Sequence, residues 1–437
     1  MDYANKVKKI LYSDIAKMKL NLKHFVQNPE KDFSRKRKLD FETMLIMTVM
    51  FQSDCLTNEL LKYFNHELNT PTTSAFCQQY SKLSTSAFTH LLTTFNSHFP
   101  IKTYKNKYQL IACDGTEFNI ARNPNDPDSF NPPSGCSKKG YNMIHVTSFF
   151  DLINKRYLDS VTQPGRKKSE FQAICELIEN KNYNKNSIFI VDRGFYCYNF
   201  FAHAIENNSL FIVRAKDLNV KRLLNQKELP NFLDTSIEII LTKTQAKKKW
   251  FYPERSEQYR YICSNVKFDY INDDNKEYIL KLRILRFKIK ENVYENIITN
   301  LFSSEFLVDE IKELYNMRWG IETSFRDLKH IIGANNFHFK KVRYIEQDIL
   351  SRMILYNFCS IIAANVLITK KKAKHIYQIN FSIAIKICHT FLRKNTEEIN
   401  IQIGSLISKF ILPIRPNRVY DRRHRPPPPV SFSYRHS

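Results

Sequence analysis

Two aspartates stand where buried strands would hold them rigidly. Asp114 follows the apolar run 108–113, and Asp192 follows the apolar run 187–191. Ligand sites in open α/β sheets lie at the carboxyl ends of strands, so both positions suit a functional carboxylate. An aspartate before or near a glycine is also common in ordinary turns, so neither residue is diagnostic by itself.

A third acidic residue, Glu322, belongs to a set of polar side chains with helical spacing. The set is Tyr315, Arg318, Glu322 and Lys329. At helical periodicity these side chains fall within one stripe roughly 60° wide. An Arg318–Glu322 ion pair on a solvated face is the simplest alternative and would contribute only a few tenths of a kcal/mol. Tyr315 and Trp319 are unusual on such a face and favour a functional one.

Three carboxylates brought together would repel one another unless cations neutralise them. Hard divalent cations with oxygen ligands are their natural partners. Two such ions, roughly 4 Å apart, can activate a water molecule and stabilise a leaving oxygen in phosphoryl transfer. Basic side chains nearby would hold a phosphodiester backbone. The candidate residues therefore predict metal-dependent phosphoryl transfer on DNA or RNA.

The charge of the chain favours the same substrate. Lys and Arg number 67 against 43 Asp and Glu, a net charge of +24 over 437 residues. A surplus of this size on a folded protein points to a polyanion, although a Lys-rich proteome would produce a basic surface without one. The hydrophobic share of 43% is enough for several domains with buried cores.

Cysteine usage and hydropathy argue against other protein classes. None of the nine cysteines forms a C-x-x-C pair, which disfavours zinc modules and disulfide scaffolds and fits a reducing cytoplasm. Residues 1–23 are charged and amphipathic, unlike a secretory signal. The longest apolar run, 353–369, is shorter than the roughly 20 residues of a spanning helix. We expect a cytoplasmic protein with no membrane segment and interpret that run as a buried core helix.

The elements that position these residues fall into five segments. Residues 1–100 have helical periodicity, and a helix, a short polar turn and a second helix suit either a helix-turn-helix reader of DNA or a plain bundle. Residues 101–217 alternate strands and helices, which predicts a mixed sheet covered by helices. Residues 218–300 are rich in strands, 301–400 are helical again, and 401–437 form a basic, proline-rich tail.

One predicted strand in the third quarter of the chain carries alternating basic residues. Along the strand 278–289 and just beyond it these are Lys281, Arg283, Arg286, Lys288 and Lys290, with a slip in phase near Leu285 that indicates a β-bulge. We expect a positively charged face there.

The catalytic motifs resemble those of DDE transposases of the IS-four-like family, which are enzymes of bacterial insertion sequences. The matching residues are Asp114-Gly115-Thr116, Asp192-Arg193-Gly194-Phe195, and Tyr315, Arg318, Glu322 and Lys329, which complete the family's Tyr-Arg-Glu-Lys signature. The gaps of 78 and 130 residues between the three acids are also similar. The resemblance covers about residues 104–370.

This resemblance implies a fold and a site. The fold is an α/β ribonuclease-H-like catalytic domain with a β-rich insertion at 218–300, preceded by an all-α DNA-binding domain. Asp114, Asp192 and Glu322 would be the catalytic residues and would bind two Mg²⁺ ions, for which Mn²⁺ would substitute. The residues implied in binding DNA are Tyr315, Arg318, Lys329 and Arg193.

The resemblance also implies a reaction and its partners. A nick at each element end would free a 3′-hydroxyl, which would form a hairpin and later join target DNA. The partners are double-stranded DNA, as element ends and as target, and a second copy of the chain in a nucleoid-associated synaptic dimer. Some relatives stack an aromatic residue on a flipped base during hairpin formation, for which Tyr294 and Trp250 are the candidates here.

Three alternatives remain open at this stage. A nuclease on the same scaffold would use the same three carboxylates without strand transfer. A transposase-derived protein that only binds DNA would not need all three. A basic structural or RNA-associated protein would explain the charge but not the helical stripe.

Overall fold

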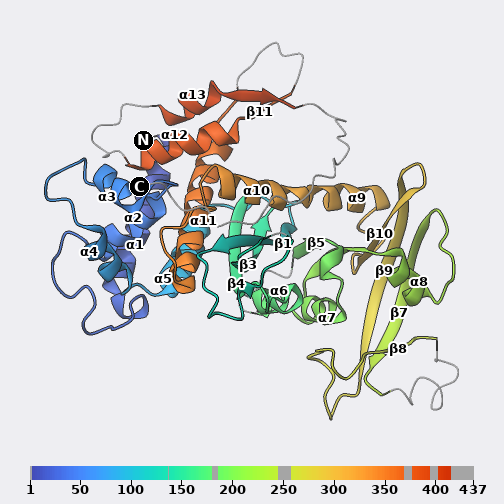
Figure 1. Ribbon diagram of the computed structural model, residues 1–437. Helices are drawn as coiled ribbons and strands as arrows, with labels where there is room; N and C mark the ends of the chain where they lie inside the picture. Colours follow the sequence, from blue (N-terminus) through green and yellow to red (C-terminus); the bar gives the residue numbers. More distant parts are fainter. Residues whose placement is uncertain are drawn as a thin grey trace.

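The computed structural model describes residues 2–135, 137–179, 186–244, 257–368, 376–393 and 402–414. A ten-stranded mixed sheet runs through the middle of it, in the order β2-β3-β1-β5-β6-β10-β9-β7-β8, with β4 paired to β3 (Figure 1). The strands are β1 (Gln109–Ile120), β2 (Phe130–Asn131), β3 (Tyr141–Asp151), β4 (Arg156–Pro164), β5 (Ser187–Val191), β6 (Leu210–Ala215), β7 (Leu233–Thr242), β8 (Tyr259–Tyr261), β9 (Glu277–Lys290) and β10 (Val293–Thr299).

The N-terminal region is helical, as predicted. Its helices are α1 (Tyr3–Leu20), η1 (Leu22–His24), α2 (Phe41–Met50), α3 (Leu56–Tyr63), α4 (Thr73–Tyr80) and α5 (Thr85–Ser97). Side-chain oxygens of Asp40, Thr72 and Ser84 accept backbone N–H bonds at the starts of α2, α4 and α5. These caps satisfy backbone donors that a helix start leaves unpaired.

The remaining helices cover both faces of the sheet and the C-terminal side of the molecule. They are α6 (Glu170–Glu179), η2 (Arg193–Phe195), α7 (Tyr198–Glu206), α8 (Asp217–Leu224), α9 (Val308–Met317), α10 (Trp319–His330), α11 (Val342–Ala364), α12 (Phe381–Arg393) and α13 (Ile403–Ser408), and a second small sheet pairs β11 (Tyr377–Ile379) with β12 (Ile411–Pro413).

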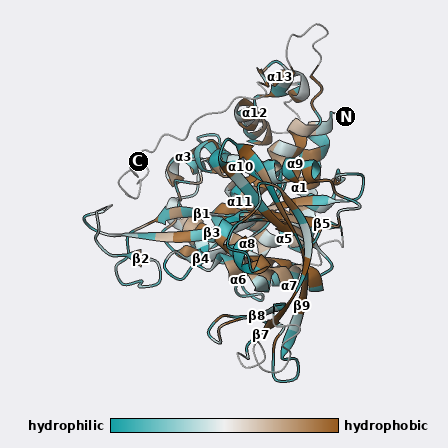
Figure 2. Cartoon of the chain, turned by 90° about the vertical axis from the view of Figure 1, so that its right-hand side faces the viewer, coloured by the Kyte–Doolittle hydropathy of each residue, from teal (hydrophilic) through white to brown (hydrophobic). Residues whose placement is uncertain are grey.

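The alternation of side chains along β1 divides the core into two clusters. Leu110 and Ala112 belong to the cluster that includes α5, α10 and α11, whereas Ile111 and Cys113 belong to the cluster with α6 and α7. Successive residues of a strand point to opposite faces, so the sheet separates the two layers. Figure 2 shows hydrophobic residues concentrated along the strands in the interior and hydrophilic ones in the outlying loops.

β1 does not end where the apolar run ends, so the prediction that Asp114 follows a strand is wrong. The strand continues to Ile120 because β3 pairs with it in antiparallel register along this length. Its parallel pairing with β5 stops earlier, at Cys113 opposite Val191. Asp114 therefore lies inside one strand but directly beyond the last pair of the β1–β5 ladder.

The strands between residues 218 and 300 continue the central sheet. β10 pairs with β6, so β10, β9, β7 and β8 extend the same ten-stranded array rather than starting another (Figure 1). The helix α8 also lies in this stretch. The strand-rich composition that was expected for the segment is thus observed.

The expected positive face of β9 is confirmed only in part, because Lys281, Lys288 and Lys290 are exposed but the two arginines are buried. Arg283 is 4% exposed and is paired with Asp234, and Arg286 is 6% exposed and is paired with Asp217. These acidic partners are distant in sequence, so spacing alone could not reveal them. The β9–β7 register runs unbroken through Leu285, and the irregularity on the β10 side lies at 293–294 instead.

The long apolar helix is buried, as predicted. Every residue of α11 from 347 to 363 is buried within the protein. In the part of the chain that the structure describes, no helix combines the length and hydropathy needed to cross a bilayer. Two predictions lie outside the described residues: the part of the basic, proline-rich tail from residue 415 onward, and the candidate Trp250.

Candidate active site

Asp114 is a carboxylate under electrostatic strain. The pKa of Asp114 is raised to about 6, chiefly because the carboxyl group is buried. The negative charges of Asp192 and Glu322 contribute smaller rises to this pKa, whereas the N–H of Gly115 and the guanidinium of Arg318 lower it. Asp192 and Glu322 therefore lie within electrostatic range of Asp114.

Asp192 is oriented by the turn that follows it. It comes directly after β5 and caps η2, where its Oδ1 accepts the Gly194 N–H at 2.6 Å. This bond fixes the carboxylate at the edge of the sheet beside β1. Arg193, the next residue, is exposed, as a side chain that contacts DNA must be.

Arg318 joins the other two acids. Its Nη2 donates to Glu322 Oε1 at 2.6 Å, and its Nη1 lies 3.6 Å from Asp114 Oδ2. The arginine side chain is only 6% exposed, so the interpretation of a solvated ion pair is wrong. The guanidinium is also within 5.0 Å of the Trp319 ring, an arrangement that favours a cation over its face.

The glutamate helix α10 is held tightly against the sheet. Ile321 is fully buried, and the hydroxyls of Ser324 and Tyr157 are 2.9 Å apart. A Cβ on Gly320 would stand 2.9 Å from Leu152 Cδ2, so a glycine permits this close approach. These contacts fix the helix face on which Glu322 stands.

The predicted helical stripe from Tyr315 to Lys329 crosses the junction between α9 and α10. Tyr315 belongs to α9 and Glu322 to α10, yet Arg318 between them keeps helical angles of φ −49° and ψ −36°. Tyr315 is buried, and burial raises the pKa of its phenol. Lys329 Nζ donates to the carbonyl of Glu117 at 2.7 Å, and burial lowers the pKa of its ammonium. The roles of these residues in DNA binding stay predictions.

The donor chemistry of the site suits a hard divalent cation. Carboxylate oxygens are the preferred ligands of Mg²⁺, and the raised pKa of Asp114 shows negative charge that the protein leaves partly uncompensated. Within the described residues, however, no three His, Cys, Asp or Glu side chains are close enough to form a ready coordination shell. The guanidinium of Arg318 provides positive charge between Asp114 and Glu322 in this conformation.

Two further residues adjoin the aspartates and were missed by the sequence analysis. Glu170 starts α6, and its Oε1 lies 3.0 Å from Nε2 of His145 on β3. The imidazole lowers the pKa of the glutamate through this contact. No motif or spacing marks either residue in the sequence, because β3 and α6 meet only in the folded sheet.

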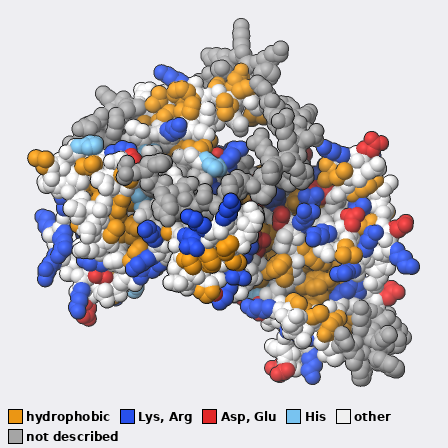
Figure 3. All heavy atoms as spheres, viewed as in Figure 1, with side chains coloured by type: hydrophobic (Ala, Val, Ile, Leu, Met, Phe, Trp, Pro, Cys, Tyr) orange, Lys and Arg blue, Asp and Glu red, His pale blue; other side chains and the backbone are white. Residues whose placement is uncertain are grey.

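A polar cavity of about 500 Å³ extends from this pair along β1. Its lining includes Gly115, Asn119, Tyr141, Lys168 and Lys329. Basic side chains are also more numerous than acidic ones on the face shown in Figure 3, as the net charge requires. Asp114, Asp192 and Glu322 do not line this cavity, but its lysines are compatible with an extended polyanion.

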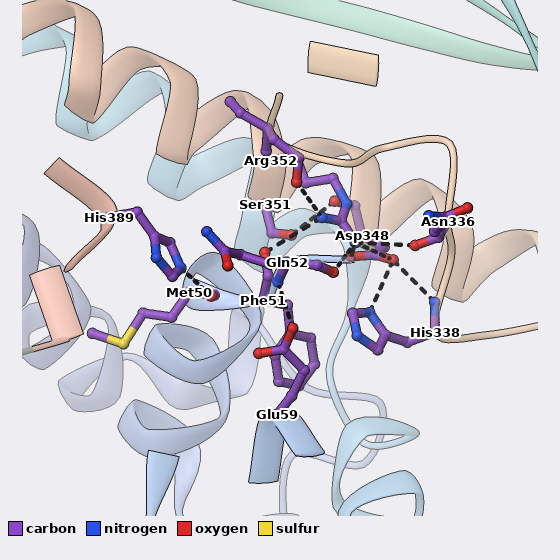
Figure 4. Close-up of polar contacts among 11 residues, drawn as sticks. Met50, Phe51, Gln52, Glu59, Asn336, His338, Asp348, Ser351, Arg352 and His389 are labelled. Atoms are coloured by element: carbon purple, nitrogen blue, oxygen red, sulfur yellow. Dashed lines mark hydrogen bonds and ion pairs between the residues drawn. The ribbon is translucent and has the colours of Figure 1, made fainter. Parts of the chain in front are cut away.

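A buried arginine ties the glutamate helix to the N-terminal helices. Arg352 of α11 is 0% exposed and pairs with Asp348 at 3.2 Å. Its guanidinium also donates to the carbonyl of Phe51 at 3.3 Å (Figure 4). It donates to the carbonyl of Ile332 at the same distance of 3.3 Å. Phe51 follows α2 and Ile332 follows α10, so one side chain joins both loops.

The two loops meet closely around this arginine. Gly333 has a φ of +90°, and a Cβ there would lie 1.8 Å from Ser53 Oγ. Asp348 also accepts the N–H of His338, which lies further along the loop after α10 (Figure 4). The position of the glutamate helix therefore depends on the N-terminal helical region.

The comparison with protein families decides what this site belongs to. Residues 105–358 match the family described as the transposase DDE domain. This chain is a DDE transposase. Membership implies DNA binding, cleavage and strand transfer, with catalysis by divalent metal ions. The match includes all three predicted acids and spans more than half of the chain.

Other comparisons add little to this identification. No curated protein matches the transposase. A solved structure, the cryo-EM synaptic complex of piggyBac transposase with hairpin DNA, is similar at 11% identity and a TM-score of 0.45. That alignment covers 96% of this chain and 87% of the other. At this TM-score the likeness carries no argument about mechanism.

Proposed function

We propose that this transposase moves a bacterial insertion sequence of the IS-four-like kind by cutting and pasting its DNA. The observation that carries the proposal is the position of Arg318 between Asp114 and Glu322, with Asp192 close enough to raise the pKa of Asp114. The arginine of the Tyr-Arg-Glu-Lys set thus contacts an aspartate that is distant in the sequence, and its glutamate shares that arginine. A chance helical stripe would not make this contact.

Asp114, Asp192 and Glu322 would hold two Mg²⁺ ions. When bound, such ions supply an activated water and neutralise the charge that develops on the leaving oxygen. Asp114 must lose its proton to act as a ligand, which its pKa of about 6 allows near neutral pH. Arg318 must loosen its contact with at least one acid, and it would then be available to a phosphate of the transferred strand.

The basic side chains around the acids would position the DNA. Lys329 lies on α10, and Arg193 follows β5. Each would neutralise one phosphate and help to align the scissile bond. Tyr294 on β10 is the described candidate for stacking on a flipped base, and the Arg286 guanidinium already lies 4.5 Å from its ring centroid. Stacking of this kind would contribute about 1–3 kcal/mol.

The reaction would run on paired ends. The transposase would act as a homodimer that holds two element ends, and the freed 3′-hydroxyls would form hairpins before joining target DNA. The test is incubation of the purified protein with DNA that carries its native flanks, with and without Mg²⁺, followed by mapping of every strand end. We expect Mg²⁺-dependent breaks at the element boundaries with hairpin termini. Absence of breaks at those boundaries would contradict the proposal.

A further inference from the structure

Asp114 and Asp192 lie just beyond the last backbone pair between β1 and β5. The parallel ladder between β1 and β5 ends at Cys113 opposite Val191, one residue before each acid. In the described sheet no β1–β5 pair follows that point, so the ladder itself does not set the distance from Asp114 to Asp192. Metal ligands must be held to a fraction of an ångström to be useful. Asp114 is held on its other side by pairing with Ser148 of β3, and Asp192 by its bond to Gly194, so a side chain between the two could adjust their separation.

Glu170 lies near the residues that follow both aspartates. A Cβ built on Gly115 would stand 2.5 Å from its Oε1, and a Cβ built on Gly194 would stand 3.7 Å from its Oε2. Gly115 follows Asp114 within β1, and Gly194 donates its N–H to Asp192. The carboxylate is therefore close to Gly115 and lies on the side of Gly194 where a side chain would project.

His145 holds Glu170 in this place. The imidazole is 2% exposed and its Nε2 lies 3.0 Å from Glu170 Oε1. It also packs against Gly115, where a Cβ would approach the same nitrogen to 2.3 Å. A rigid ring behind the carboxylate leaves the glutamate little freedom to withdraw.

We propose that Glu170, in contact with His145, is a positioning residue for metal binding. It sets the distance between the β1 backbone at Asp114 and the turn that follows Asp192. The proposal rests on the proposed role of Asp114 and Asp192 as metal ligands. Glu170 acts from the face of β1 on which Gly115 lies, whereas the side chain of Asp114 belongs to the opposite face. It therefore acts through the backbone and is not itself a ligand.

The test is direct measurement of Mn²⁺ binding by electron paramagnetic resonance on the full-length protein, with no turnover required. Glu170→Ala should raise the dissociation constant for Mn²⁺ roughly 10-fold or more, as loss of outer residues does at other metal sites. Glu170→Gln keeps the length of the side chain and its contact with His145, so it should retain most of the affinity. Glu176→Ala, on the same helix but bonded to Gln172, is the matched control.

Each outcome decides the matter. Unchanged Mn²⁺ affinity in Glu170→Ala would overturn the proposal, and equal losses in Glu170→Gln and Glu170→Ala would show that charge rather than span matters and would overturn it too. If Glu170→Ala does not fold, Glu170→Asp is one methylene shorter and should weaken binding in the same way. Wild-type protein that binds no Mn²⁺ would instead remove the proposed metal site itself.

Discussion

Arg318 and Glu322 form an ion pair of 2.6 Å one helical turn apart, and the same guanidinium faces Asp114 at 3.6 Å. An arginine thus occupies a position between two acids where metal ions would be needed for catalysis. Its charge and that of a divalent ion compete for the same carboxylates. Arg318 would therefore have to release at least one of these carboxylates when metal ions and DNA bind.

Replacing Arg318 with glutamine should tighten metal binding while impairing catalysis. Without the guanidinium, Asp114 and Glu322 lose their compensating charge and attract Mn²⁺ more strongly, by roughly 10-fold for about 1.4 kcal/mol of lost competition. Cleavage should fall because a phosphate contact is also lost. Calorimetric titration with Mn²⁺ and a cleavage assay would measure both effects. Weaker Mn²⁺ binding in Arg318→Gln would show that the arginine does not compete with metal.

The strained carboxylate of Asp114 should destabilise the metal-free protein at neutral pH. Its folded pKa of about 6 lies above the ordinary value of 3.8, so the folded state holds the proton more tightly than the unfolded state. The resulting loss of stability is complete above the folded pKa and disappears below the ordinary one. Asp114→Asn should therefore raise the free energy of unfolding near pH 8 by up to about 3 kcal/mol.

Denaturant unfolding in EDTA over a range of pH would measure this difference. The gain from Asp114→Asn should shrink steadily as the pH falls from 6 towards 3.8. A gain that stays constant with pH would mean that the carboxylate is not strained.

Lys329 should contribute one phosphate contact. Its ammonium is anchored on the carbonyl of Glu117 beside the polar cavity, so Lys329→Ala removes a charge that faces the DNA groove. The slope of log affinity against log salt should become shallower by about 0.9. Fluorescence anisotropy with a labelled element end would measure it. An unchanged slope would remove Lys329 from the DNA interface.

Local pattern predicted much of the fold. The strand at 187–191 and the helix at 198–206 lie where apolar runs and periodicity placed them, and the helical stripe around Glu322 followed from spacing alone. Non-local pairing could not be predicted. The extension of β1 depends on β3, and the burial of Arg283 depends on Asp234, which is distant in the chain.

The residues of the site also fall into those that local sequence pattern indicates and those that depend on non-local contacts. The three acids were candidates from the sequence because each stands at or within a recognisable element, and their catalytic roles stay predictions. Glu170 and His145 could not, because their contact arises between a helix and a strand that only the folded sheet brings together. Arg352 directly precedes the apolar run 353–369, and no motif marks it. Its role could not be predicted because its carbonyl partners, Phe51 and Ile332, lie on loops outside that helix.

Removing Arg352 should be costly. Arg352→Met leaves the carboxylate of Asp348 buried without its cation, and two loops lose their shared donor. We expect the free energy of unfolding to fall by about 3–5 kcal/mol. The double variant Arg352→Met with Asp348→Leu should recover part of that loss, because no buried charge remains. Equal losses in the single and double variants, measured by urea unfolding, would contradict this explanation.

The most direct test of the catalytic claim is single-turnover cleavage by three amide variants in Mg²⁺. Asp114→Asn, Asp192→Asn and Glu322→Gln should each slow cleavage at native element ends by about 1,000-fold or more, since each removes one metal ligand. Binding of the uncleaved DNA should remain close to wild type. The control Glu176→Gln should cleave normally. Cleavage at the wild-type rate by any of the three variants would show that the carboxylates do not act as one metal-binding unit.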